Sequence, residues 1–184
     1  MIDSDIRKLP EFNPLSAGLM PDFRLSKFCE LRGRGCRVPP KMVSNMMIGF
    51  NSMAPPPPED DDKKVGVGID CTITPIKKGG YCIVSNTDMF YPITDDPYIM
   101  GRVACVSLLS DMYAMGVVDI DNILMYLGIS AKLTQAERDI IIPLMLKGFK
   151  DAASEAGTRV SGGQTVINPW LMLGGVATSI CAKE

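Results

Sequence analysis

Three aspartates stand in or beside apolar stretches of the chain. Asp70 follows the run VGVGI, Asp88 follows YCIVSNT, and Asp111 lies in a segment, LLSDMYAMG, whose other residues are mostly apolar. A carboxylate that is buried without a partner is strongly destabilising. The pattern therefore indicates that a cation, a metal ion or a basic side chain, neutralises these groups.

The residues leave two kinds of cation open. Asp70 and Asp88 are expected at strand ends, where α/β sheets gather ligands, although a lone aspartate there is also a common turn residue. Together with an acid on a helix they suit Mg²⁺, which takes carboxylates, water and substrate phosphates. For Asp111, the spacing alone favours neither a metal nor a salt bridge to Arg102 or another base of the core.

Two glycine-containing segments are candidate anion sites. Gly162, Gly163, Gln164 and Thr165 follow an expected strand, where backbone N–H groups and side-chain donors close around an anion. In residues 33–37, GRGCR, glycines flank Arg34 and Arg37, whose guanidinium forks match phosphate oxygens. An ordinary turn is the alternative for both segments.

Strand and helix patterns must position these residues. Strands are expected at residues 65–70, 81–86, 122–130, about 159–160 and 171–180, which are rich in aliphatic residues and bounded by Gly, Pro or Asp. One helix is expected to have Asp95 or Asp96 as N-cap, Pro97 as its first residue and Gly116 just past its end. On it, Ser107 and Asp111 share a face with Ala104 and Ala114.

A second helix is expected to open with the capping box Thr134–Glu137, to kink at Pro143 and to end at Gly157. Long helices between strands predict an α/β fold, an α+β sandwich of sheet and helices. Residues 1–50 are expected to form an N-terminal arm with a short helix at 40–50. Residues 51–64, NSMAPPPPEDDDKK, have the composition of a disordered linker, and residues 65–184 form the α/β domain.

Composition narrows the functional classes. The chain has 184 residues, 46% hydrophobic and 22% charged, with a net charge of −2, so it offers no basic field for a nucleic acid. It has no histidine, and its six cysteines lack CxxC spacing, which argues against the usual zinc sites and His-based triads. No apolar run reaches the roughly 18 residues of a membrane span, and scattered cysteines suit a reducing compartment, so a cytoplasmic protein without a membrane partner is expected.

Five motifs together resemble the eukaryotic selenophosphate synthetase (selenide, water dikinase) family. They are GRGCRVP at 33–39, VGVGID at 65–70, TDMFYPITDDPYIMGRVA at 87–104, LSDMYAMGV at 109–117 and GGQTVINPW at 162–170. The motifs follow the family's order over nearly the whole chain. The resemblance implies an aminoimidazole-ribonucleotide-synthetase-like N-terminal ATP-binding domain, a mixed sheet with helices on one face that dimerises through the sheet, with the family's second domain absent.

The resemblance also implies an activity and its residues. The reaction is the Mg-ATP-dependent formation of selenophosphate from selenide for selenocysteine synthesis. Asp70, Asp88 and Asp111 are then expected to bind Mg²⁺ and the ATP phosphates. Gly68 and Ile69 would border the nucleotide, and the segment Gly162, Gly163, Gln164 and Thr165 would hold its phosphates or ribose.

Two positions depart from the family pattern in the glycine-rich loop. Arg34 stands where active members carry Cys or selenocysteine, and Arg37 stands where the family has a catalytic Lys. An arginine at position 34 resembles the paralogue type that acts in redox or vitamin B6 homeostasis. The alternative hypothesis is therefore a non-catalytic, ATP-binding, homodimeric regulatory protein.

Overall fold

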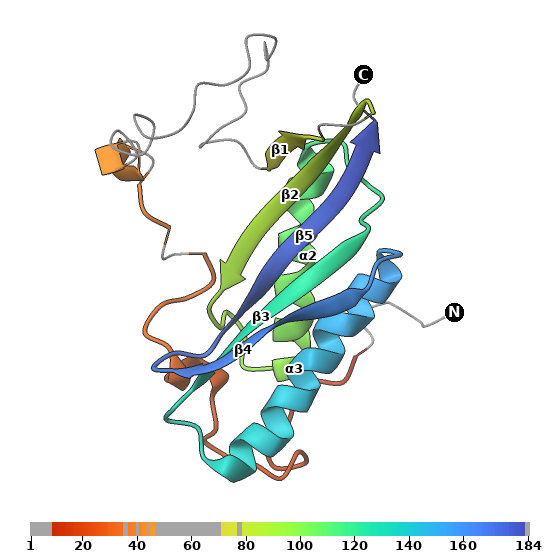
Figure 1. The fold of residues 1–184 in the computed structure, drawn as a ribbon. Helices are drawn as coiled ribbons and strands as arrows, with labels where there is room; N and C mark the ends of the chain where they lie inside the picture. The colour runs from red at the N-terminus through yellow and green to blue at the C-terminus, as the bar shows by residue number, and fades with distance from the viewer. Residues whose placement is uncertain are drawn as a thin grey trace.

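The computed structural model of the protein describes residues 9–34, 37–39, 41–43, 45–46, 71–76 and 79–182. Among these residues, five strands form one sheet, and two long helices lie against one of its faces (Figure 1). Residues 51–70 lie outside the described residues. The expected linker at 51–64 and the expected strand at 65–70 are therefore untested.

The sheet is mixed and has the strand order β1-β2-β5-β3-β4. Its members are β1 (Thr72–Pro75), β2 (Tyr81–Phe90), β3 (Asn122–Ser130), β4 (Val160–Asn168) and β5 (Met172–Ala182). Strands β3 and β4 run parallel, and the other neighbouring pairs are antiparallel. The predicted α/β fold, a mixed sheet with helices on one face, is confirmed.

Two strands are longer than predicted, and one was not predicted. Strand β2 continues to Phe90 because buried and exposed side chains alternate along its whole length; Asp88 therefore lies within the strand and not at its end. Strand β4 is exposed at most positions, so its sequence carries no hydrophobic alternation, and its parallel pairing with β3 defines it. The short strand β1 is held by its ladder with β2.

Helix α2 (Pro97–Ala114) begins and ends as predicted. The Asp96 carboxylate accepts a hydrogen bond from the Ile99 N–H at 3.0 Å, and Pro97 is the first helical residue. Gly116 follows the helix with a φ of +79°, a left-handed conformation that favours glycine. The N-cap is therefore Asp96, the second of the two aspartates considered.

Helix α3 (Gln135–Glu155) also opens as predicted. The Thr134 hydroxyl accepts from the Glu137 N–H at 3.3 Å, while the Glu137 carboxylate accepts from the Thr134 N–H at 2.8 Å. The helix runs through Pro143 and ends at Glu155, two residues before the predicted Gly157. Among the described residues, no helix combines the length and apolar character needed to cross a membrane.

The two helices approach each other through glycines. A Cβ added to Gly101 would lie 2.1 Å from the backbone oxygen of Met145, and one added to Gly148 would lie 1.9 Å from that of Tyr98. Each helix therefore packs directly against the backbone of the other. This close crossing fixes the position of α2, which carries Ser107 and Asp111.

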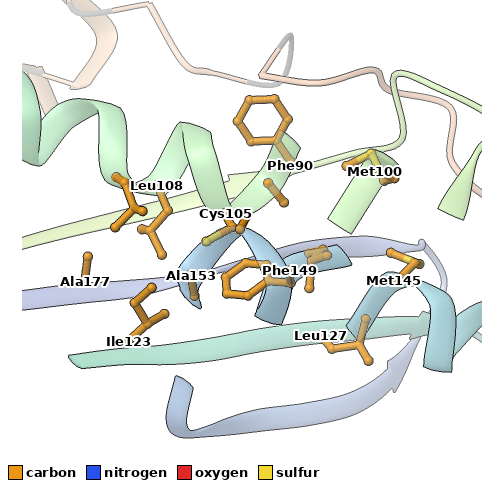
Figure 2. Close-up of a cluster of buried hydrophobic side chains, with 14 of the residues drawn as sticks. Phe90, Met100, Cys105, Leu108, Ile123, Leu127, Met145, Phe149, Ala153 and Ala177 are labelled. Atoms are coloured by element: carbon orange, nitrogen blue, oxygen red, sulfur yellow. The ribbon is translucent and has the colours of Figure 1, made fainter. Parts of the chain in front are cut away.

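The core lies between the sheet and the helices (Figure 2). Leu108 from α2 and Phe149 from α3 are fully buried against side chains of the central strands such as Ile123 and Leu127. Leaving these apolar groups exposed would cost roughly 1.5–3 kcal/mol for each large side chain. The helices therefore cover one face of the sheet and leave the other face open.

The described part of the N-terminal arm packs against the domain. Leu19, Phe23 and Leu25, the last in the 3-10 helix η2 (Leu25–Phe28), join the hydrophobic core. The Phe28 carbonyl then accepts a hydrogen bond from the Leu171 N–H at 3.0 Å. The arm therefore reaches the end of the sheet, and residues 41–43 and 45–46 beyond it are helical, as predicted for 40–50.

Candidate functional site

Strand β2 places Asp88 on the face of the sheet that the helices cover. Its side chain is only 6% exposed, while the neighbouring Met89 faces the open side. The Asp88 carboxylate accepts hydrogen bonds from the Ser107 hydroxyl at 3.1 Å and from the Met89 N–H at 3.0 Å. Two neutral donors do not neutralise a buried carboxylate, so the charge needs a cation.

Helix α2 brings Asp111 beside Asp88. Ser107 and Asp111 are four residues apart, which places them one turn apart on the same helix face, as predicted. The Asp111 side chain is 16% exposed. A serine and an aspartate of the helix therefore face one aspartate of the strand.

Two arginines of the glycine-rich loop complete the cluster. One guanidinium nitrogen of Arg34, Nη2, lies 2.5 Å from Asp88 Oδ2 and 2.9 Å from Asp111 Oδ2. Arg37 is farther away, with its Nη2 atom 3.6 Å from Asp88 Oδ1 and 3.9 Å from Asp111 Oδ2. We call these four residues the Arg34 cluster; two carboxylates and two guanidiniums make it neutral overall.

The backbone before Arg34 is anchored to the end of β2. Gly33 and Tyr91 exchange two backbone hydrogen bonds, of 3.0 and 3.1 Å. Gly33 has a φ of +52°, and an added Cβ would lie 2.6 Å from a methyl carbon of Ile93, so only glycine fits. The Arg34 guanidinium carbon lies 5.7 Å from the centre of the Phe90 ring, within cation–π range.

In the structure, the cation beside Asp88 and Asp111 is a guanidinium. Asp111 pairs with arginines of the loop and not with Arg102, which instead forms a two-pronged pair with Glu155 at 2.8 and 2.6 Å. Hydrogen bonding to Glu155 raises the pKa of Arg102, and the same contact lowers the pKa of Glu155. The Arg102–Glu155 pair therefore links α2 to α3, while Arg34 pairs with the two aspartates of the site.

A divalent cation does not fit between Asp88 and Asp111 while Arg34 occupies this position. Mg²⁺ requires oxygen ligands at about 2.0–2.1 Å, and here a guanidinium nitrogen already contacts both carboxylates. Asp70, the third expected ligand, lies outside the described residues, as do Gly68 and Ile69. Among the residues that the structure describes, no group of three or more acidic, Cys or His side chains is arranged to hold a metal.

The segment 162–165 lies apart from the Arg34 cluster. Gly162, Gly163, Gln164 and Thr165 lie within strand β4, so the expected position after a strand is wrong. Strand β4 is three strands away from β2, which carries Asp88. With neighbouring strands about 4.8 Å apart, the segment and the cluster are separated by roughly 14 Å across the sheet. The row of paired residues that shows this is Asp88, Gly175, Met125 and Gly163.

The two faces of β4 also divide this segment. Gln164 points to the open face, where it lines a shallow groove with Met89 and Tyr126, opposite the face that holds Asp88. A Cβ on Gly163, which has a φ of +149°, would lie 1.8 Å from the Met125 carbonyl oxygen. Close approach of β3 therefore explains the glycine at 163 in structural terms.

Three residues support the Arg34 cluster through contacts that the sequence did not predict. Ser107 donates to Asp88, Phe90 lies against Arg34, and Gly33 fixes the backbone before it. The four-residue spacing of Ser107 and Asp111 was the available signal for the first. Nothing in the sequence links Gly33 to Tyr91, because the two residues meet only through the fold.

Comparison with known proteins places the chain in a family. Residues 68–181 match the model described as AIR synthase related protein, N-terminal domain. "Selenide, water dikinase 3" of Danio rerio is 43% identical over 92% of this chain and 42% of its own length. "Probable selenide, water dikinase" of Caenorhabditis elegans is 47% identical over 97% of this chain and 46% of its own length. The chain thus spans a little under half the length of these relatives.

A solved structure supports the fold independently of close sequence similarity. The structure described as AaThiL complexed with AMPPCP and TMP matches with a TM-score of 0.57 at 13% identity, covering 77% of this chain and 41% of that one. At this identity the likeness concerns the fold alone. By its matched domain and its relatives, the chain belongs to the AIR synthase related protein family and is a homologue of the eukaryotic selenide, water dikinases.

Proposed function

We propose that this chain provides the nucleotide-binding part of a selenide, water dikinase, an ATP-dependent phosphotransferase. In the proposed reaction, ATP, selenide and water give selenophosphate, AMP and phosphate, and the selenophosphate serves selenocysteine synthesis. The names of the relatives and their identity over more than nine-tenths of this chain support the proposal. Because the chain spans less than half of their length, the activity of the whole protein is part of the proposal.

The observation that carries the proposal is the Arg34 cluster. Its arginines come from the loop, Asp88 from β2 and Asp111 from α2, so the fold assembles the cluster from three distant segments. Arg37 is 61% exposed, and its contacts of 3.6 and 3.9 Å are longer than hydrogen bonds. Its fork is therefore available to phosphate oxygens, the ligand that guanidinium geometry matches best.

Each residue then has a role in the proposed site. Arg37, at the family's Lys position, binds a phosphate of ATP, and the carboxylates of Asp88 and Asp111 orient the two guanidiniums. We propose that the nucleotide also contacts the exposed segment Gly162, Gly163, Gln164 and Thr165. Gly68, Ile69 and Asp70 are further proposed nucleotide contacts. In the proposed complex, Mg²⁺ enters the site bound to the phosphates of ATP.

The open face of the sheet supports a homodimer as part of the proposal. Strand alternation directs exposed apolar side chains to this face, namely Tyr81, Met89, Leu124, Val166 and Ile180. Apolar groups gathered on one face are typical of an association surface. The proposed location is the cytoplasm, whose reducing conditions suit the buried cysteines Cys29, Cys71, Cys82 and Cys105.

One observation favours a second candidate function. A guanidinium is not a nucleophile, and Arg34 stands at the family's Cys or selenocysteine position with ion pairs to the buried Asp88 and the partly buried Asp111. This arrangement suits a nucleotide-binding regulatory homodimer that forms no selenophosphate. The two candidates share ATP binding and differ in selenide-dependent turnover.

Binding is tested first, by titrating the chain with ATP in a calorimeter and by measuring its melting temperature. ATP is expected to raise the melting temperature, since a ligand that binds only the folded state stabilises it. The variant Arg37→Ala should weaken binding by about tenfold, the loss of one charge-assisted contact. Arg159→Ala removes an exposed arginine just before β4, three strands away from the β2 strand that carries Asp88, and should change nothing. An unchanged melting curve with saturating ATP would contradict both candidate functions.

Turnover separates the two candidates. The protein is incubated with ATP and selenide, and AMP and selenophosphate are measured by ³¹P NMR. AMP that forms only with selenide, and that disappears in Asp88→Asn, supports the dikinase. ATP binding without AMP formation supports the regulatory protein.

A further inference from the structure

The cation at the centre of the Arg34 cluster belongs to the chain itself. A single nitrogen atom of Arg34 contacts one oxygen of Asp88 and one oxygen of Asp111. Two largely buried carboxylates that share one contact atom repel each other unless a cation lies between them. Arg34 supplies that cation and leaves the pair no need for another.

The charge of the cluster equals that of a site filled by a divalent ion. Arg34 and Arg37 together carry two positive charges against the two negative charges of Asp88 and Asp111. Arg34 makes the close contacts, and Arg37 lies 3.6 Å or more away, as a second and more weakly held charge. A metal ion added to the pair would raise the positive charge next to both guanidiniums.

Arg34 is held in place by its neighbours and not by the aspartates alone. Its preceding residue, Gly33, exchanges two backbone hydrogen bonds with Tyr91, and its guanidinium faces the Phe90 ring at 5.7 Å. A group tethered one residue from a fixed backbone position has a high effective concentration at its target. A dissolved metal ion has to compete with this tethered cation.

We propose that Arg34 replaces a divalent metal ion between Asp88 and Asp111, and that this carboxylate pair is closed to divalent cations until Arg34 is removed. The inference deepens the proposed function by naming the cation of the same site, and it rests on that function only for the role of the site. Its test measures the binding of a metal ion in the absence of nucleotide. The result can therefore be interpreted even if the protein does not bind ATP.

The experiment is a titration of the chain with Mn²⁺, followed by electron paramagnetic resonance of the free ion. Five forms are compared: the wild type, Arg34→Ala, Asp88→Asn, the double variant Arg34→Ala/Asp88→Asn, and the control Arg32→Ala. Arg32 lies directly before the loop and has the same charge, but its guanidinium donates to the carbonyl groups of Cys29 and Leu31 and not to the aspartates. Both variants lose one positive charge, so a difference between Arg32→Ala and Arg34→Ala reports the effect of the guanidinium's position next to the aspartates.

Arg34→Ala is expected to bind Mn²⁺ at least about tenfold more tightly than the wild type, and Arg32→Ala should resemble the wild type. The double variant should lose the gain, because one of the two carboxylates is then neutral. Mn²⁺ should also raise the melting temperature of Arg34→Ala more than that of the wild type. Mg²⁺ should displace the Mn²⁺ from Arg34→Ala.

Three results would overturn the inference. The first is equal Mn²⁺ affinity in the wild type and Arg34→Ala, and the second is a gain that persists in the double variant. The third is tight binding by the wild type that Asp88→Asn abolishes. Circular dichroism checks the fold of each variant; if Arg34→Ala does not fold, Arg34→Gln takes its place, since it removes the charge while keeping a polar side chain next to the carboxylates.

Discussion

Replacing Gly101 by alanine should force helices α2 and α3 apart. The new Cβ would lie 2.1 Å from the Met145 carbonyl oxygen, where ordinary contact begins at 3.4 Å. The helices must therefore separate by about 1.3 Å, which exceeds the gap at which dispersion contacts lose a quarter to half of their energy. The backbone oxygen cannot rotate away as a side chain would.

The expected loss of stability follows from two opposing effects. Overpacking of this kind costs roughly 1–3 kcal/mol or more, whereas alanine in a helix is favoured over glycine by about 1 kcal/mol. Because the obstacle is backbone, we expect an overpacking cost of about 3 kcal/mol, the upper end of that range; subtracting the gain of about 1 kcal/mol leaves a net loss of about 2 kcal/mol. For a chain of this size, the melting temperature should then fall by about 4–8 °C.

The assay is urea unfolding followed by circular dichroism, with Ser154→Ala as an exposed control on α3. Gly148→Ala should have a similar effect, since its Cβ would lie 1.9 Å from the Tyr98 carbonyl oxygen. The double variant should lose less than the sum of the single losses, because one separation of the helices makes room for both methyl groups. A stabilised Gly101→Ala variant, or strictly additive losses, would refute this account of the crossing.

Two further predictions concern the ends of the helices. Glu155→Gln should lower the free energy of unfolding by about 2 kcal/mol at neutral pH, because it weakens a charged pair with the buried Arg102. Since Arg102 lowers the pKa of Glu155 below its usual 4.5, this difference should be complete above pH 4.5 and should vanish as the pH falls through the lowered pKa, as a pH series of urea titrations would reveal. If the stability difference between Glu155→Gln and the wild type persisted at acidic pH, it would arise from altered packing and not from the charged pair. Thr134→Ala should cost about 1 kcal/mol by removing the capping box of α3, with the exposed Lys132→Ala as a control, and equal melting temperatures for the two variants would contradict it.

Much of the architecture was readable from local sequence signals. Asp96, Pro97 and Gly116 marked the limits of α2, and the Thr134–Glu137 capping box marked the start of α3, because caps depend on residues adjacent in the chain. Strand β3 was also predicted, since its aliphatic residues are bounded by polar ones. Strand β4 was underestimated because it carries no apolar alternation and depends on pairing with β3.

The sequence by itself indicated that Asp88 and Asp111 need a cation, because both aspartates stand in or beside apolar stretches of the chain. Only the tertiary structure decided which cation it is. Arg34 lies 77 residues from Asp111, and nothing in their spacing relates them. The contact exists because Gly33 pairs with Tyr91 at the end of β2 and because the close crossing of α2 and α3 holds Asp111 opposite the strand.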